Sequence, residues 1–170
     1  KSLINPGDEV IVFAPYFGEY RSYTSNYDGV LVEISPDTDT FQPKLNEFEQ
    51  KITPKTKAVI VNTPNNPTGV VYSEETIQKM EAKQKEYGTE IYLISDEPYR
   101  ELVYDGVEVP YLTKYYANTV VGYSYSKSLS LPGERIGYLV IPDEVADSED
   151  LRSAANVATR ILGFVNAPTL

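Results

Sequence analysis

The chain has 170 residues, with 15 Lys and Arg against 25 Asp and Glu, so its formal net charge is −10. The length suits one domain, and 41% hydrophobic with 24% charged residues is a globular composition, which excludes disorder or a fibre as the state of the whole chain. An acidic chain repels nucleic acid and anionic membranes, so we expect neither as a partner.

Two missing residue types limit the chemistry further. The sequence has no Cys and no His, which excludes disulfides, thiolate metal sites, imidazole bases and most zinc or iron centres. We therefore expect no metal, and acid–base chemistry from Lys, Tyr or carboxylates. No apolar run approaches the roughly 20 residues of a membrane span and no leader stands at the start, so we expect a cytoplasmic protein. Because the chain begins at Lys1 and its single Met is Met80, we expect it to derive from a longer protein.

Six short apolar runs predict β-strands. They are residues 10–13, 29–33, 58–62, 91–95, 119–123 and 136–141. Each run is almost continuously apolar and does not alternate with polar residues. This pattern is typical of buried strands in a sheet that helices cover on both faces.

Helices are predicted between these strands. Residues 44–52 place apolar side chains on one face, between the second and third strands. Ser73 precedes two glutamates and a helical apolar pattern that ends at Gly88, which predicts a capped crossover helix between the third and fourth strands. A third helix is expected from Ser148 to near Gly163, ahead of residues 166–168.

The alternation of strands and helices predicts an open, mostly parallel α/β sheet with right-handed crossovers. No linker divides the chain into two domains. In such sheets, ligands bind at the carboxyl ends of the strands. The functional side chains are therefore expected in the segments that follow the strands.

Three such segments carry polar side chains. The third strand runs into Asn62–Gly69, a rigid loop in which Asn66 could face a ligand and Asn66–Pro67 is a candidate cis bond. The fourth runs into Asp96, which needs an Arg or a protonated ligand nitrogen as partner unless it merely caps a helix. The fifth leads to Lys127 and Arg135, which are surface cations if each is taken alone. Together these segments could hold a pyridine ring, form a Schiff base and bind a phosphate.

At this point the sequence resembles the fold-type I pyridoxal-phosphate enzymes, and among them the class I/II aminotransferases. The motifs that carry the resemblance are Pro6–Val10 with Pro15–Tyr20, Asn65–Gly69, Ser95–Tyr99, and Ser124–Lys127 through Arg135–Gly137. The resemblance covers essentially the whole chain. It implies a three-layer α/β/α large domain, incomplete here, whose mostly parallel sheet has one antiparallel strand, with residues 1–170 as its central part.

The resemblance also implies roles for catalytic residues. Lys127 would form a Schiff base with pyridoxal 5′-phosphate and then carry a proton between substrate and cofactor. Asp96 would pair with the protonated ring nitrogen. Tyr99 and Asn66 would hydrogen-bond the phenolic oxygen of the ring. Lys127, Asp96 and Tyr99 are thus the predicted catalytic residues.

The remaining cofactor contacts follow from the same resemblance. Ser124 and Arg135 would bind the phosphate, with Ser126 a weaker candidate, and Phe17 would stack on the ring. The substrates would be an amino acid and a 2-oxo acid, and the parent protein would be a homodimer.

Some elements of the family fall outside the chain. A phosphate-binding turn and a Tyr from the partner subunit would lie upstream of Lys1, and the small domain with its carboxylate-binding Arg would follow Leu170. We therefore expect this chain alone to be inactive.

Three alternatives remain open. A carbon–sulfur β-lyase of the same fold would use the same cofactor contacts. A non-catalytic ligand-binding α/β domain would instead use Asp96 and Glu97 for a metal and leave Lys127 on the surface. The parent could also be a transcription regulator with an aminotransferase-like sensor domain. The sequence does not identify the amino acid substrate.

Overall fold

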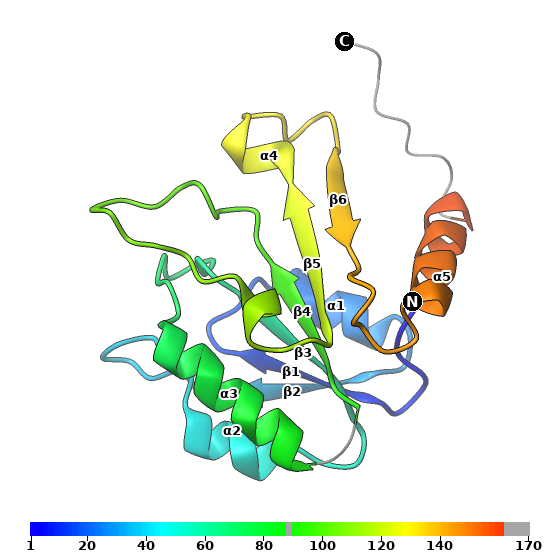
Figure 1. Cartoon of the computed structure of the whole chain (residues 1–170), viewed down its shortest axis with the longest axis horizontal. Helices are drawn as coiled ribbons and strands as arrows, with labels where there is room; N and C mark the ends of the chain where they lie inside the picture. The colour runs from blue at the N-terminus through cyan, green and yellow to red at the C-terminus, as the bar shows by residue number, and fades with distance from the viewer. Residues whose placement is uncertain (88–89, 162–170) are drawn as a thin grey trace.

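A computed structural model describes residues 1–87 and 90–161, which form a six-stranded sheet between two layers of helices (Figure 1). The strands are β1 (Glu9–Phe13), β2 (Val30–Ile34), β3 (Thr56–Asn62), β4 (Tyr92–Asp96), β5 (Thr119–Ser124) and β6 (Gly137–Val140). Their order in the sheet is β2-β1-β3-β4-β5-β6, and only the β5–β6 pair is antiparallel among the described strands. The predicted fold class and all six predicted strands are confirmed.

The helices connect these strands and cover the sheet. The expected helices appear as α2 (Leu45–Lys51), α3 (Glu74–Tyr87) and α5 (Ser148–Ile161). The Ser73 hydroxyl accepts from the Thr76 N–H at 3.1 Å, as a helix cap does. The ends expected at Gly88 and near Gly163, with residues 166–168 beyond, lie outside the described residues.

Three further helical elements were not predicted. They are α1 (Glu19–Ser25), the 3-10 turn η1 (Leu112–Lys114) and α4 (Tyr125–Ser128). With seven, three and four residues, they are too short to show a helical apolar period.

Two apolar cores lie on opposite faces of the sheet. In β1, Ile11 and Phe13 pack in one core with Phe48 of α2 and residues of α3, whereas Val10 belongs to the other core, on which Leu151 of α5 packs. Because successive side chains of one strand enter different cores, the strands are apolar almost throughout. The three-layer arrangement therefore explains the sequence pattern.

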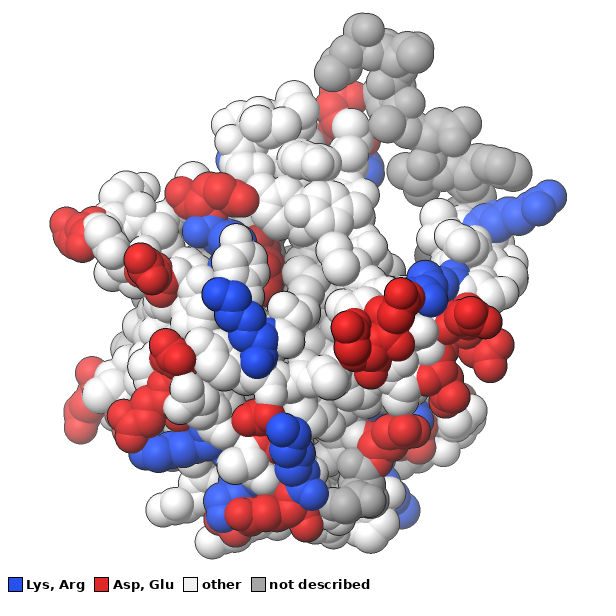
Figure 2. Space-filling view, in the orientation of Figure 1, with Lys and Arg blue, Asp and Glu red and all other residues white. Residues whose placement is uncertain are grey.

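The prediction that β6 is buried is wrong. Its side chains Tyr138, Leu139 and Val140 are all exposed, and the described part of α5 has no buried residue. Figure 2 shows few charged side chains over β5, β6 and α4. Within the described residues β6 is an edge strand that pairs only with β5, so its apolar composition does not bring burial.

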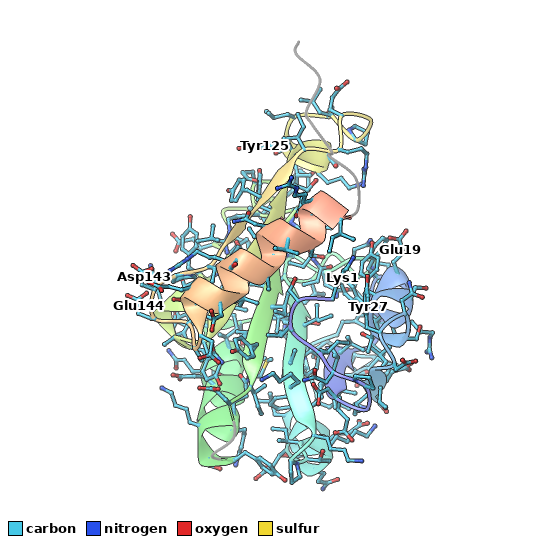
Figure 3. The ribbon with its side chains drawn as sticks, turned by 90° about the vertical axis from the view of Figure 1, so that its right-hand side faces the viewer. Lys1, Glu19, Tyr27, Tyr125, Asp143 and Glu144 are labelled. Atoms are coloured by element: carbon cyan, nitrogen blue, oxygen red, sulfur yellow. The ribbon has the colours of Figure 1, made fainter. Side chains whose placement is uncertain are left out.

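Figure 3 shows α5 lying across the strands, with α1, which begins at Glu19, to one side of it. Over residues 1–87 and 90–161, no helix combines the length and the apolar character needed to cross a bilayer.

Candidate active site

A cavity of about 360 Å³ lies at the carboxyl ends of β3, β4 and β5. The parallel register sets Asn62 of β3 beside Asp96 of β4, and Asp96 beside Gly122 of β5. All seven predicted cofactor-binding residues line this cavity, together with Ser126. They are Phe17, Asn66, Asp96, Tyr99, Ser124, Lys127 and Arg135. The structure thus brings together residues that are up to 118 positions apart in the chain (135 − 17).

Asp96 is the carboxylate of this cavity, and it is the last residue of β4 instead of a helix cap. Its hydrogen-bond donor is Tyr20, to which the sequence analysis assigned no role, and the Tyr20 hydroxyl donates to Oδ2. Burial raises the pKa of Asp96, the Tyr20 hydrogen bond opposes this, and the nearby Glu97 charge adds to it. No protein group in the described part of the chain donates to Oδ1 of Asp96. That oxygen is therefore available to a ligand.

Glu97 does not join Asp96 in a second acidic site. It is buried, with Oε1 accepting from the Ser95 hydroxyl and Oε2 from Nε of Arg100, both at 2.6 Å. Both carboxylate oxygens of Glu97 are thus engaged by neighbouring protein groups, and Glu97 is not among the residues that line the cavity. Across the ranges that the structure describes, there is also no group of three or more acidic side chains that could hold a metal ion. The contacts of Glu97 with Ser95 and Arg100 therefore weigh against a metal shared by Asp96 and Glu97.

Hydrogen bonds of two asparagine side chains hold the loop after β3 in place. Asn62 donates through Nδ2 to the main-chain oxygen of Asp96 at 2.8 Å and accepts from the Asn66 N–H at 2.7 Å. The Asn65 side chain accepts from the N–H and hydroxyl of Thr68. The Asn66–Pro67 bond is cis, as predicted. Asn62 and Asn65 thus hold the loop, while the side chain of Asn66 lines the cavity.

Lys127 of α4 also lines the cavity. Its Nζ is 5.9 Å from the centroid of the Tyr99 ring, and its side chain is exposed. Burial and the Asp96 charge raise the pKa of the Tyr99 phenol. The Ser124 hydroxyl accepts from the Ser126 N–H at 3.1 Å and donates to the Ser126 hydroxyl at 2.7 Å. Ser124 therefore caps the helix that carries Lys127, a role that the sequence analysis did not assign to it.

Arg135 and Phe17 complete the cavity wall. Arg135 is exposed, adopts a positive φ of 54°, and donates through Nη1 to the Pro132 oxygen at 2.8 Å. The Phe17 ring meets the Tyr20 ring edge-on, with 5.7 Å between centroids. Two cationic residues, Lys127 and Arg135, and the carboxylate residue Asp96 therefore line the same cavity.

Sequence reasoning assigned no role to three polar residues that also line the cavity: Asn62, Tyr20 and Tyr23. The Glu19 hydrogen bond is the largest of several influences that raise the pKa of Tyr23, to about 12, and the Arg135 charge opposes them. Tyr20 and Tyr23 follow Phe17 at intervals of three residues, a spacing that could have placed all three on one side of a helix. A larger groove of about 630 Å³ lies between β5, β6 and α5 and shares Asp96 and Ser124 with the cavity.

In comparisons with known proteins, the chain is similar in sequence and in structure to aminotransferases. The family model for aminotransferases of class I and II matches residues 2–165. A probable aspartate/prephenate aminotransferase of Thermus aquaticus is 38% identical over 146 residues, which are 85% of this chain and 38% of the relative. The crystal structure of an amino transferase from Eubacterium rectale has a TM-score of 0.92 and 53% identity over 98% of this chain and 43% of that one. An alanine aminotransferase from Pyrococcus furiosus has a TM-score of 0.88 and 31% identity over 98% and 42%. The chain thus spans about two fifths of the length of these relatives.

Proposed function

Because this chain belongs to the family of class I and II aminotransferases, we propose that it is the central part of the large domain of a pyridoxal-phosphate-dependent aminotransferase. The whole protein would exchange an amino group between an amino acid and a 2-oxo acid. The observation that carries this proposal is the convergence of Lys127, Asp96 and Arg135 on one cavity.

The residues present fit pyridoxal phosphate by their chemistry. The cofactor has an aldehyde that needs an amine, a ring nitrogen that is protonated beside an anion, and a phosphate that needs cations and hydroxyls. Lys127 supplies the amine, the free Oδ1 of Asp96 the anion, and Arg135 a cation at the same cavity. Ser124 and Ser126 add hydroxyls: the Ser124 hydroxyl donates to Ser126, and among the described residues the Ser126 hydroxyl keeps its own hydrogen available to donate to a phosphate oxygen.

Each residue then has a task that follows from its side chain. When bound, pyridoxal phosphate supplies an electron sink for the electrons of a broken bond at the amino acid α-carbon. Asp96 holds a proton at the ring nitrogen, while Asn66 and Tyr99 orient the phenolic oxygen. Lys127 binds the cofactor through Nζ and moves a proton to and from the α-carbon.

The remaining residues hold the cofactor in place. Phe17 covers one face of the ring. Arg135 and Ser124 hold the phosphate, and Ser126 assists them through its contact with Ser124.

The amino acid substrate is left open by the relatives. Their names include aspartate/prephenate and alanine aminotransferases, so similarity at this level does not distinguish acidic from small apolar substrates. We further propose that the whole protein is a cytoplasmic homodimer and that this chain alone is inactive, because it spans only about two fifths of the length of its relatives.

The test is covalent labelling by the cofactor. The chain is titrated with pyridoxal phosphate under visible absorption, reduced with borohydride and mapped by peptide analysis. We expect the label on Lys127 and its loss in Lys127→Ala. Lys79→Ala is the matched control, because Lys79 is exposed in α3 and pairs with Glu75.

Labelling that spreads over surface lysines, and is equal in Lys127→Ala, would overturn the proposed site. The lyase alternative is tested on the whole protein with a cystathionine-like substrate. Release of pyruvate and ammonia, without transfer of the amino group to a 2-oxo acid, would favour a β-lyase.

A further inference from the structure

We infer that Tyr20 is a positioning residue for Asp96, whose hydroxyl keeps the buried carboxylate ionised and turned so that Oδ1 faces a ligand in the cavity. The identity of that ligand as pyridoxal phosphate rests on the proposed function. The Tyr20–Asp96 contact itself does not depend on it.

The geometry of Tyr20 shows how α1 reaches Asp96. Tyr20 is 6% exposed, and its hydroxyl donates to Oδ2 of a residue 76 positions later. Its ring is held between Phe17, edge-on at 5.7 Å, and Tyr16, stacked at 6.4 Å between centroids. A ring fixed on two sides holds its hydroxyl in place, so the hydrogen bond also fixes the orientation of the carboxylate.

The main chain of Asp96 is held independently. Its oxygen accepts from Nδ2 of Asn62 at 2.8 Å. The residue is therefore anchored at the backbone by β3 and at Oδ2 by α1. Oδ1 is the part of Asp96 that these two contacts leave free.

The hydroxyl of Tyr20 also favours the ionised form of Asp96. Burying a carboxylate without a donor favours its neutral form, and a hydrogen bond to the ionised form counteracts this. Burial raises the pKa of Asp96 and the Tyr20 hydrogen bond lowers it. A protonated Asp96 could no longer stabilise a positive charge at a ring nitrogen. The other titratable groups of the cavity wall or beside Asp96 are Tyr23 in α1, Glu97 and Tyr99 after β4, Lys127 in α4 and Arg135 before β6. None of them donates a hydrogen bond to Asp96 in the described structure.

The first experiment uses the chain without cofactor. The carboxyl of Asp96 is titrated by ¹³C NMR in wild type and in Tyr20→Phe, which removes only the hydroxyl. Loss of a charge-assisted hydrogen bond to the ionised form should make Asp96 a weaker acid, with an acid dissociation constant about tenfold smaller. Tyr16→Phe is the matched control, because Tyr16 lies in the same segment but donates to Glu33. If folded Tyr20→Phe has the same acid dissociation constant for the Asp96 carboxyl as the wild type, the inference is overturned.

A reciprocal measurement covers the case in which Tyr20→Phe does not fold. Burial is the largest cause of the raised pKa of the Tyr20 phenol, and the negative charge of Asp96 is the next. Asp96→Asn removes that charge. The phenol should then become a stronger acid, detected by its ¹³Cζ signal. A Tyr20 titration identical in wild type and Asp96→Asn overturns the inference.

A third measurement separates this inference from the proposed function. In the whole protein loaded with ¹⁵N-labelled pyridoxal phosphate, the ring nitrogen should lose its proton at a different pH in Tyr20→Phe than in wild type, because both the basicity and the orientation of Asp96 change. If the ring nitrogen of Tyr20→Phe titrates at the same pH as that of the wild type, the inference about Tyr20 is overturned. Failure of the wild type to bind the cofactor counts against the proposed function, and the titrations without cofactor still decide the role of Tyr20.

Discussion

Replacement of Arg100 by Met should destabilise the chain strongly, because Arg100 and Glu97 form a buried ion pair. Their side chains are 13% and 4% exposed, and Nε donates to Glu97 at 2.6 Å. The guanidinium also donates to the main-chain oxygens of Val109 and Pro110 at 2.8 and 2.9 Å. Met matches the length of the Arg stem but supplies none of these donors.

The loss of folding free energy follows from the buried Glu97 carboxylate, which is left without its partner. Removing one member of a buried pair leaves an uncompensated charge and costs about 3–5 kcal/mol. The whole domain is expected to be stable by only about 5–15 kcal/mol, so the loss is a large fraction. The double variant Arg100→Met with Glu97→Gln should recover roughly half, because a neutral Gln can still accept from the Ser95 hydroxyl.

The assay is urea unfolding, with free energies extrapolated to water. Lys79→Met is the control: its pair with Glu75 is 59% and 75% exposed, so we expect a loss below about 1 kcal/mol. The reasoning is refuted if Arg100→Met loses no more than this control, or if adding Glu97→Gln makes the single variant less stable.

Three further predictions concern single positions. Gln84→Met should raise stability by about 1–3 kcal/mol in urea unfolding, because both polar side-chain atoms of Gln84 are buried without a partner in the described structure; a loss would contradict this. Gly137→Ala should lower stability by about 1–3 kcal/mol, since its Cβ would lie 2.4 Å from the Tyr123 oxygen, whereas Gly133→Ala meets nothing within 4 Å and serves as control. Burial raises the pKa of Asp96 above its unfolded value of 3.8, so ionised Asp96 disfavours folding. The wild type should therefore gain stability relative to Asp96→Asn as pH falls from the raised pKa toward 3.8, and thermal unfolding with no such gain would refute this.

Much of the site could be predicted because its residues stand in local motifs at strand ends. Asn66, Asp96 and Lys127 each follow an apolar run, and parallel strands bring their carboxyl ends to one edge. The capping role of Ser124 could not be predicted, because α4 is only four residues long and has no apolar period.

The sequence by itself determined the order of the elements and the mostly parallel sheet, because apolar periodicity and turn residues act over short stretches of chain. It also indicated the family, because the motifs that carry the resemblance are short runs of neighbouring residues. Only the tertiary structure decided which side chains meet. The Tyr20–Asp96 hydrogen bond joins residues 76 positions apart, and Arg100 reaches the carbonyls of a returning loop. It also decided that the apolar residues of β6 are exposed, since burial depends on what packs against a strand and not on the strand alone.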